Sequence, residues 1–273
     1  MFGKLFKYEW KAMMKTMLPI YGAALVLAVV NGFLFQTIFG DWIEEFSLFH
    51  HMRMAAMSLY MLVLGAMGVF TVVMIIQRFY KGLLKQEGYL MFTLPVKTWK
   101  LIFSKACVSF TASVCSTIVA MLSLGLFGGM DFLRVLMLMP GRIIELVREG
   151  YSINPELCIH LMVFMLEIIL SLIVKGFASI YELYFAMALG QMSKNHKIVC
   201  SILWFMVMNT VISFVGMLLL GAGISLMDVM DTSEEMFKNI HAVGLQMLAV
   251  QVISLTVFMA GTGYVLDRKL NLE

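Results

Sequence analysis

Six long apolar stretches follow one another along the chain and are separated by short polar segments. Several of them run for about 20 residues or more with almost no charge, which is enough to cross a hydrocarbon layer of about 30 Å at about 1.5 Å per residue. A soluble core helix does not need such runs. We therefore predict an all-α, polytopic membrane protein with six transmembrane helices at residues 17–39, 55–77, 101–130, 158–189, 198–227 and 242–266.

Composition supports a membrane protein and narrows the function classes. Of the 273 residues, 61% are hydrophobic and 14% are charged, whereas a soluble domain is about half apolar and a quarter charged. Every polar segment is short, and no nucleophile–base or metal-protease motif occurs, so we expect no enzyme active site and no cofactor. The four cysteines form no CxxC pair, so neither a disulfide framework nor a zinc site is indicated.

Basic residues in the loops predict the orientation. Loops on the side of the N-terminus hold 14 Lys or Arg, and loops on the opposite side hold five. Positive residues concentrate on the cytoplasmic face, so we predict that both termini, including the tail 267–273, lie in the cytoplasm. Anionic lipid on the cytoplasmic face attracts these basic residues, which accounts for the net charge of +3. The charge is therefore no sign of nucleic-acid binding.

The first 16 residues have the pattern of an interfacial elbow helix. On a helical wheel, four lysines share one arc and apolar residues share the other. Pro19 is expected to kink the chain into the first span. Glu9, beside Trp10, projects from the apolar side and is either a snorkelling carboxylate or a partner of Arg78 or Lys105. The lysines are Lys4, Lys7, Lys11 and Lys15, and the apolar residues are Phe2, Phe6, Trp10, Met13 and Met17.

The segment 78–100, between the second and third predicted spans, is the longest cytoplasmic connection. It is rich in aromatic and aliphatic residues, which something must cover. Gly88 and Pro95 divide it into short pieces. One interpretation is an interfacial helix that packs on the protein's own bundle. The other is a docking element for a cytoplasmic partner.

At this point the sequence resembles a known family. A basic elbow (KYEWKAMMK), two spans, and then EGYLMFTLPVKTWKLIFSK resemble the membrane subunit of type-2 ATP-binding cassette (ABC) exporters, of the compact kind found in Gram-positive bacteria. LYFAMALGQMSKNHK, at 183–197, resembles the tight cytoplasmic turn that such permeases place between spans four and five. The resemblance covers essentially the whole chain, and its most specific part is EGYLMFTLPV at 87–96.

The resemblance implies a transport function with an external source of energy. Residues 1–16 would be the elbow, 17–77 and 101–266 the spans of one permease domain, and 78–100 the loop that holds a coupling helix. Two permease subunits would pair as a homodimer or heterodimer, each with an ATPase subunit that binds ATP and Mg. The chain itself contains no GxxxxGK[ST] phosphate loop. The implied coupling residues are Glu87, Tyr89, Leu90, Met91, Phe92, Leu94 and Pro95.

The fourth apolar stretch contains polar residues at regular steps. Glu167, Ser171, Lys175, Ser179 and Glu182 follow at steps of four, four, four and three, which predicts one side of a helix. Charges in a span are costly, so this stripe should face the bundle interior or water. It is either a Glu–Lys–Glu network that holds helices together or the polar lining of a substrate route.

Other features leave rival functions open. His50 and His51 lie near two methionines, but with 27 Met in the chain this proximity is expected by chance, and we predict no metal site. PGRIIELVREG, at 140–150, predicts a short amphipathic helix that either lies on the outer surface or forms a lid over the exit. The exporter would carry a hydrophobic or amphipathic substrate such as a peptide, lipid or drug. The rivals are an ion-gradient-driven secondary transporter or channel and a non-transporting membrane scaffold.

Overall fold

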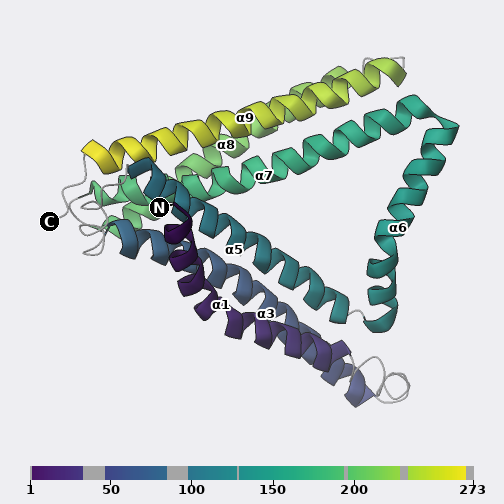
Figure 1. Cartoon of the computed structure of the whole chain (residues 1–273), viewed down its shortest axis with the longest axis horizontal. Helices are drawn as coiled ribbons and strands as arrows, with labels where there is room; N and C mark the ends of the chain where they lie inside the picture. Colours follow the sequence, from purple (N-terminus) through teal and green to yellow (C-terminus); the bar gives the residue numbers. More distant parts are fainter. Residues whose placement is uncertain are drawn as a thin grey trace. The chain divides into compact units, whose positions relative to one another are not determined.

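The computed structural model describes residues 2–32, 47–84, 98–127, 129–193, 196–227 and 233–268. Within these ranges six helices are long and apolar enough to cross a membrane, which confirms the all-α polytopic fold. The elements are α1 (Phe2–Gly32), α3 (Ser47–Phe79), the π-helical turn η2 (Tyr80–Leu84), α5 (Thr98–Phe127), α6 (Gly129–Ile153), α7 (Pro155–Gln191), α8 (Lys197–Met227) and α9 (Ser233–Arg268) (Figure 1).

The chain divides into two compact units. The first consists of Met1–Gln77 and Cys107–Leu146, and the second of Arg78–Ala106 and Val147–Glu273. The first unit therefore holds α1, most of α3 and most of α5. The second holds η2, the first turns of α5, and the helices α7, α8 and α9.

Two serines on one face of α5 hold the first unit together. Ser116 hydrogen bonds to the Tyr21 hydroxyl of α1 at 2.7 Å and to the Thr71 hydroxyl of α3 at 2.9 Å. Seven residues further on, Ser123 hydrogen bonds to the Tyr60 hydroxyl of α3 at 2.7 Å. All five side chains are buried. Small hydroxyl residues let helices approach closely and satisfy polar groups where water is absent.

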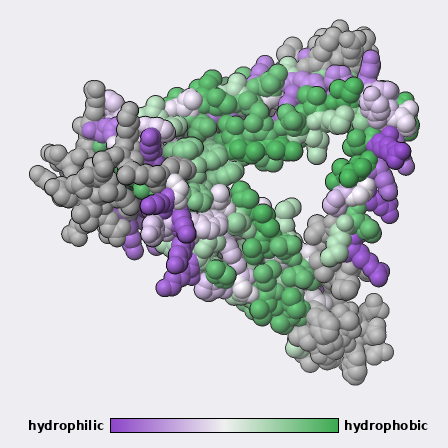
Figure 2. Space-filling view, in the orientation of Figure 1, coloured by the Kyte–Doolittle hydropathy of each residue, from purple (hydrophilic) through white to green (hydrophobic). Residues whose placement is uncertain are grey.

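The second unit is a bundle in which α7 packs against both α8 and α9, which also pack against each other. Apolar side chains dominate its surface (Figure 2). Glycines permit the closest approaches. A Cβ atom on Gly190 would collide with the Ser201 side chain and lie 2.8 Å from the Lys197 carbonyl oxygen. A Cβ atom on Gly261 of α9 would lie 2.6 Å from the Phe185 ring of α7.

Local sequence explains where α7 begins. Asn154 has an extended backbone, and its side chain accepts a hydrogen bond from the Leu157 backbone N–H at 3.2 Å. Pro155 follows at the first helical position, where its missing N–H removes no helical bond. The predicted span 158–189 therefore lies inside a longer helix. Helix α7 ends at Gln191 and α8 begins at Lys197, so few residues separate them, and residues 194–195 of the predicted tight turn lie outside the described residues.

The elbow and the first span form one helix. Helix α1 runs from Phe2 to Gly32 with Pro19 inside it, and it changes direction along its length (Figure 1). Proline removes one backbone bond and bends a helix without ending it when neighbouring turns are intact. The predicted remainder of this span, 33–39, lies outside the described residues.

The predicted helix at 140–150 was wrong in its bounds. Pro140 and Gly150 lie inside α6, a helix of 25 residues that begins directly after α5. Proline and glycine are not the ends because the amphipathic period continues on both sides of them. The predicted loop 78–100 is also shorter, since η2 extends to Leu84 and α5 begins at Thr98.

The close approach at Gly190 predicts opposite effects for two matched substitutions. Gly190→Ala should lower the free energy of unfolding by about 1–3 kcal/mol, because backbone atoms of α8 cannot yield to the new methyl group. Gly216→Ala on α8, where a Cβ atom meets nothing within 4 Å, should be neutral or raise stability by roughly 0.5–1 kcal/mol. Thermal unfolding in detergent, followed by circular dichroism, checks this. Equal effects would contradict the packing described.

Candidate functional site

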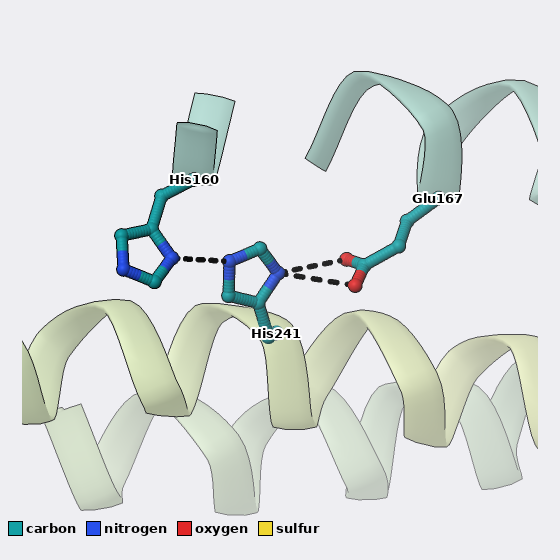
Figure 3. A network of polar contacts seen from close by, with 3 residues as sticks. All are labelled: His160, Glu167 and His241. Atoms are coloured by element: carbon teal, nitrogen blue, oxygen red, sulfur yellow. Dashed lines mark hydrogen bonds and ion pairs between the residues drawn. The ribbon is translucent and has the colours of Figure 1, made fainter. Parts of the chain in front are cut away.

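Two histidines and a glutamate join α7 to α9 (Figure 3). Nδ1 of His241 on α9 lies 3.0 Å and 3.2 Å from the two carboxylate oxygens of Glu167 on α7. Nε2 of His241 lies 3.2 Å from Nδ1 of His160, also on α7. The side chains of His241 and Glu167 are only 18% and 14% exposed. The three groups therefore form a continuous chain of hydrogen bonds between two membrane helices.

The order of donors along this chain follows from its chemistry. A carboxylate only accepts, so His241 donates Nδ1–H to Glu167. In neutral His241 the other nitrogen, Nε2, is then an acceptor, and His160 donates Nδ1–H to it. A second proton on His241 would reverse the bond to His160. The arrangement can therefore hold one additional proton and relay it between His160 and Glu167.

Aromatic and small residues shape the surroundings of the network. The His160 ring stacks on Phe237 of α9 at 4.9 Å between centroids, and the Phe164 ring lies edge-on to His241 at 6.4 Å. A Cβ atom on Gly244 of α9 would lie 3.0 Å from a Glu167 oxygen, so glycine leaves space for the carboxylate. These neighbours keep the imidazole rings in position.

The predicted stripe on α7 does not stay together. Glu167 pairs with His241, and Ser171 donates a hydrogen bond to Gln251 of α9 at 3.0 Å. Lys175 and Ser179 are exposed, and within the described residues Lys175 pairs with neither glutamate. The reason is geometric: each step of four residues rotates about 40° around a helix of 3.6 residues per turn. Lys175 has therefore turned about 80° away from Glu167.

Glu182, the last stripe residue, faces a different helix. Its side chain is buried, and Asn209 of α8 is its hydrogen-bond partner. The other carboxylate oxygen, Oε1, has no hydrogen-bond partner among the described residues. The predicted Glu–Lys–Glu network is thus replaced by two separate contacts, one from α7 to α9 and one from α7 to α8.

The predicted coupling residues, from Glu87 to Pro95, lie outside the described residues, but both roots of their loop are described. The Phe79 ring at the end of α3 stacks on Tyr184 of α7, with centroids 4.0 Å apart. A Cβ atom on Gly82 of η2 would lie 2.5 Å from Nζ of Lys105, so η2 and the first turns of α5 lie against each other. Phe79, Leu83 and Leu101 are fully buried.

The elbow residues show the expected division into two faces. The four lysines are exposed, whereas Met13 and Met17 are fully buried. Trp10 is half-buried and stacks on Phe6 with ring centroids 6.2 Å apart. Glu9 is half-buried beside it.

Nothing in the described part of the chain gathers ligands for a metal ion. His50 and His51 lie edge to face on α3, and both are exposed. No group of three or more His, Cys, Asp or Glu side chains could hold a metal within the described ranges. In the α7–α9 network the ring nitrogens point at one another and not at a common centre, which is why it suits protons better than metal.

Sequence reasoning missed His160 and His241. The signal on α7 was available, since His160 precedes Glu167 by seven residues and therefore shares its face. The pairing of His160 with His241 could not be predicted from the sequence, because 81 residues separate the two histidines.

No protein-family model matches this chain, and neither the curated proteins nor the solved structures contain a match.

The network predicts measurable coupling between Glu167 and His241. His241→Phe should destabilise the protein because it leaves a carboxylate without its partner in an apolar span. Adding Glu167→Leu should recover part of that loss, with a coupling energy of about 1 kcal/mol, within the range measured for hydrogen bonds between membrane helices. Chemical unfolding of both single variants and the double variant measures it. Strictly additive losses would show that the pair contributes nothing.

A matched control separates charge from shape. Glu167→Gln keeps an oxygen that accepts from His241 and removes the charge. If the hydrogen bond stabilises the helix pair, Glu167→Gln should be much milder than Glu167→Leu.

Proposed function

We propose that this chain is the membrane subunit of an ABC exporter in the bacterial cytoplasmic membrane, with both termini in the cytoplasm. It pairs with a second permease subunit, and each binds an ATPase subunit that carries ATP and Mg. The loop sequence EGYLMFTLPV, the order of elbow, spans and loop, and the lack of a phosphate loop in the sequence support this proposal. Six membrane helices provide the scaffold it needs.

The observation that carries the proposal is the packing at the roots of the loop. A loop that passes force must be attached rigidly at both ends. Here the end of α3 stacks on α7 through Phe79 and Tyr184, and Lys105 of α5 lies over Gly82 of η2. Leu83 and Leu101, beside the two attachment points, are fully buried. Interiors this close-packed transmit displacement and do not absorb it.

This attachment gives the ATPase a route to the membrane helices. Closure of the ATPase subunits around ATP moves the loop, and Phe79 passes that displacement to α7. Helix α7 contacts both α8 and α9, so its movement changes the bundle. In this proposal the ATPase subunit hydrolyses ATP, and the membrane helices of this chain move in response.

The substrate route in this proposal uses the polar positions of α7. Lys175 and Ser179 are exposed on a span whose exposed side chains are mostly apolar. A lysine in that position meets water or a polar group of cargo at lower cost than lipid. Leu172 and Ile173, close to Lys175 on the same helix, are exposed apolar residues, which suits a hydrophobic or amphipathic substrate with a polar head.

Loss of the aromatic loop residues should release the ATPase. With Tyr89, Phe92 and Leu94 all changed to Asp, the tagged protein should no longer co-purify with an ATPase subunit from native membranes, because charge opposes burial of this segment. Mass spectrometry of the purified complex measures the stoichiometry. Tyr8→Asp is the control, since Tyr8 is an exposed aromatic residue outside the loop. Retention of the ATPase by the triple variant would contradict the proposal.

Phe79, where α3 meets the loop, should be needed for the permease to control ATP hydrolysis and should not be needed for the ATPase subunit to bind. Phe79→Ala removes the ring that stacks on Tyr184, so the ATPase should still co-purify while its hydrolysis rate no longer responds to the permease. Val69→Ala, at an exposed position of the same helix, is the matched control. Loss of both binding and response would mean that Phe79 only supports folding.

A second candidate function, a proton-driven secondary transporter, is favoured by the His160–His241–Glu167 chain. A relay of titratable groups inside a span is the usual apparatus of a proton-coupled carrier. The hydrogen-bond network links two membrane helices, and one added proton would reverse its His160–His241 bond. This candidate needs no ATPase.

Proton flux distinguishes the two candidates. Proteoliposomes that contain only this chain are given a pH gradient, and an entrapped pH-sensitive dye reports the flux. An exporter subunit should show no flux above that of empty vesicles. If flux is present and His241→Phe abolishes it while Thr210→Ala on α8 does not, the carrier replaces the exporter. Thr210 is exposed, and its hydroxyl donates to the Met206 carbonyl of its own helix.

A further inference from the structure

Helix α6 is amphipathic along its full length. At 100° per residue, its arginines and glutamates occupy one arc, and its apolar residues occupy the wider remaining arc, with Leu138 the one apolar residue centred among the charges. Figure 2 shows this division as green and purple on opposite sides of the helix. The described apolar residues of that face include Val135, Met137, Met139, Ile143, Ile144 and Leu146.

The apolar face of α6 is open. All of those six side chains are exposed, with Met137 at 79% and Ile144 at 69%. An exposed apolar face of this length is unusual on a surface that meets water. Something must therefore cover this apolar face, and the position of α6 between two predicted spans indicates what covers it.

The neighbours of α6 hold it at a membrane surface. Helix α5 ends at Phe127 and α7 begins at Pro155, and both are long and apolar enough to cross the bilayer. Helix α6 is not among the candidate spans. A chain that leaves one span and enters the next without crossing stays at one face of the membrane. The helix is about 37 Å long and begins within two residues of the span before it.

We propose that α6 lies in the plane of the membrane surface, with its apolar arc among the acyl chains and its charged arc among the headgroups. Lipid is the occupant because α6 is joined at both ends to helices that are apolar enough to cross the bilayer, and its exposed apolar side chains are of the kind that lipid covers on such helices. Residues 129–153 contain three arginines and three acidic residues. Attachment therefore depends on apolar burial and not on anionic lipid.

Spin labelling of the full-length protein in vesicles tests the position. The four cysteines are replaced by alanine, and single labels are placed at Met137, Ile144, Arg134 or Glu145. Accessibility to oxygen, which enters the hydrocarbon, is compared with accessibility to a water-soluble nickel complex. We expect the oxygen-to-nickel ratio to be several-fold higher at the first two positions than at the last two. The ratios should be equal in phosphatidylcholine alone and with added phosphatidylglycerol.

Each alternative occupant gives a different result. Protection of Met137 and Ile144 from both reagents would show that protein, either a second copy or another partner, covers the face, and it would overturn the proposal. High nickel accessibility at those positions would place the helix in water and overturn it as well. A ratio that falls when phosphatidylglycerol is removed would show attachment through charge.

A second measurement is available if the variant without cysteines does not fold. Ile144→Trp and Glu145→Trp in the native background are compared for quenching by brominated phosphatidylcholine, after the signal of the parent protein is subtracted. Tryptophan at 144 should be quenched more strongly than tryptophan at 145. Equal quenching would overturn the proposal.

Discussion

The absence of water in the hydrocarbon core governs this structure, because every polar group there must find its partner within the protein. Helices satisfy the backbone. Hydroxyl side chains within spans bond to their own helix, as Thr71 does to the Met67 carbonyl and Thr262 does to the Phe258 carbonyl. Where a polar group reaches further, it joins two helices, as Tyr21 and Ser116 do in the first unit. Polar pairs are therefore the specific contacts, and apolar packing fills the space between them.

Helix α7 departs from this rule, because one of its charged side chains has a partner on another helix and others are exposed or incompletely hydrogen-bonded. Glu167 is satisfied by His241, so its cost in the membrane is largely offset. Lys175 is exposed, and Glu182 keeps an oxygen that no described residue satisfies. A charge in a span costs a few kcal/mol on insertion scales. A protein keeps such a cost where the group meets something outside the chain, such as water, cargo or a second subunit. In the proposed exporter, Lys175 and Glu182 are therefore better candidates for contact with cargo than the histidine network is.

The sequence was sufficient for the membrane fold and insufficient for its polar contacts. Uninterrupted apolar runs identified all six spans, because length and hydropathy are local properties. Helix ends were less certain, since Pro140 and Gly150 are read as boundaries only when neighbouring periodicity is ignored. The stripe failed as a single face because steps of four residues turn Lys175 and Ser179 about 80° and 120° away from Glu167. His241 was out of reach altogether, because a helix pattern does not specify which distant helix packs against it.

The two candidate functions converge on the same helix. Helix α7 has 37 residues and is about 55 Å long, well beyond a hydrocarbon thickness of about 30 Å. Tyr184, near one end, receives the Phe79 ring from the root of the loop. His160 and Glu167, toward the other end, join it to α9. A displacement applied at Tyr184 reaches the network about 25 Å away, since 17 residues of continuous helix separate Tyr184 from Glu167. In both proposals, with energy from an ATPase or from a proton at the histidines, α7 is the rigid element that would connect the two sides of the membrane.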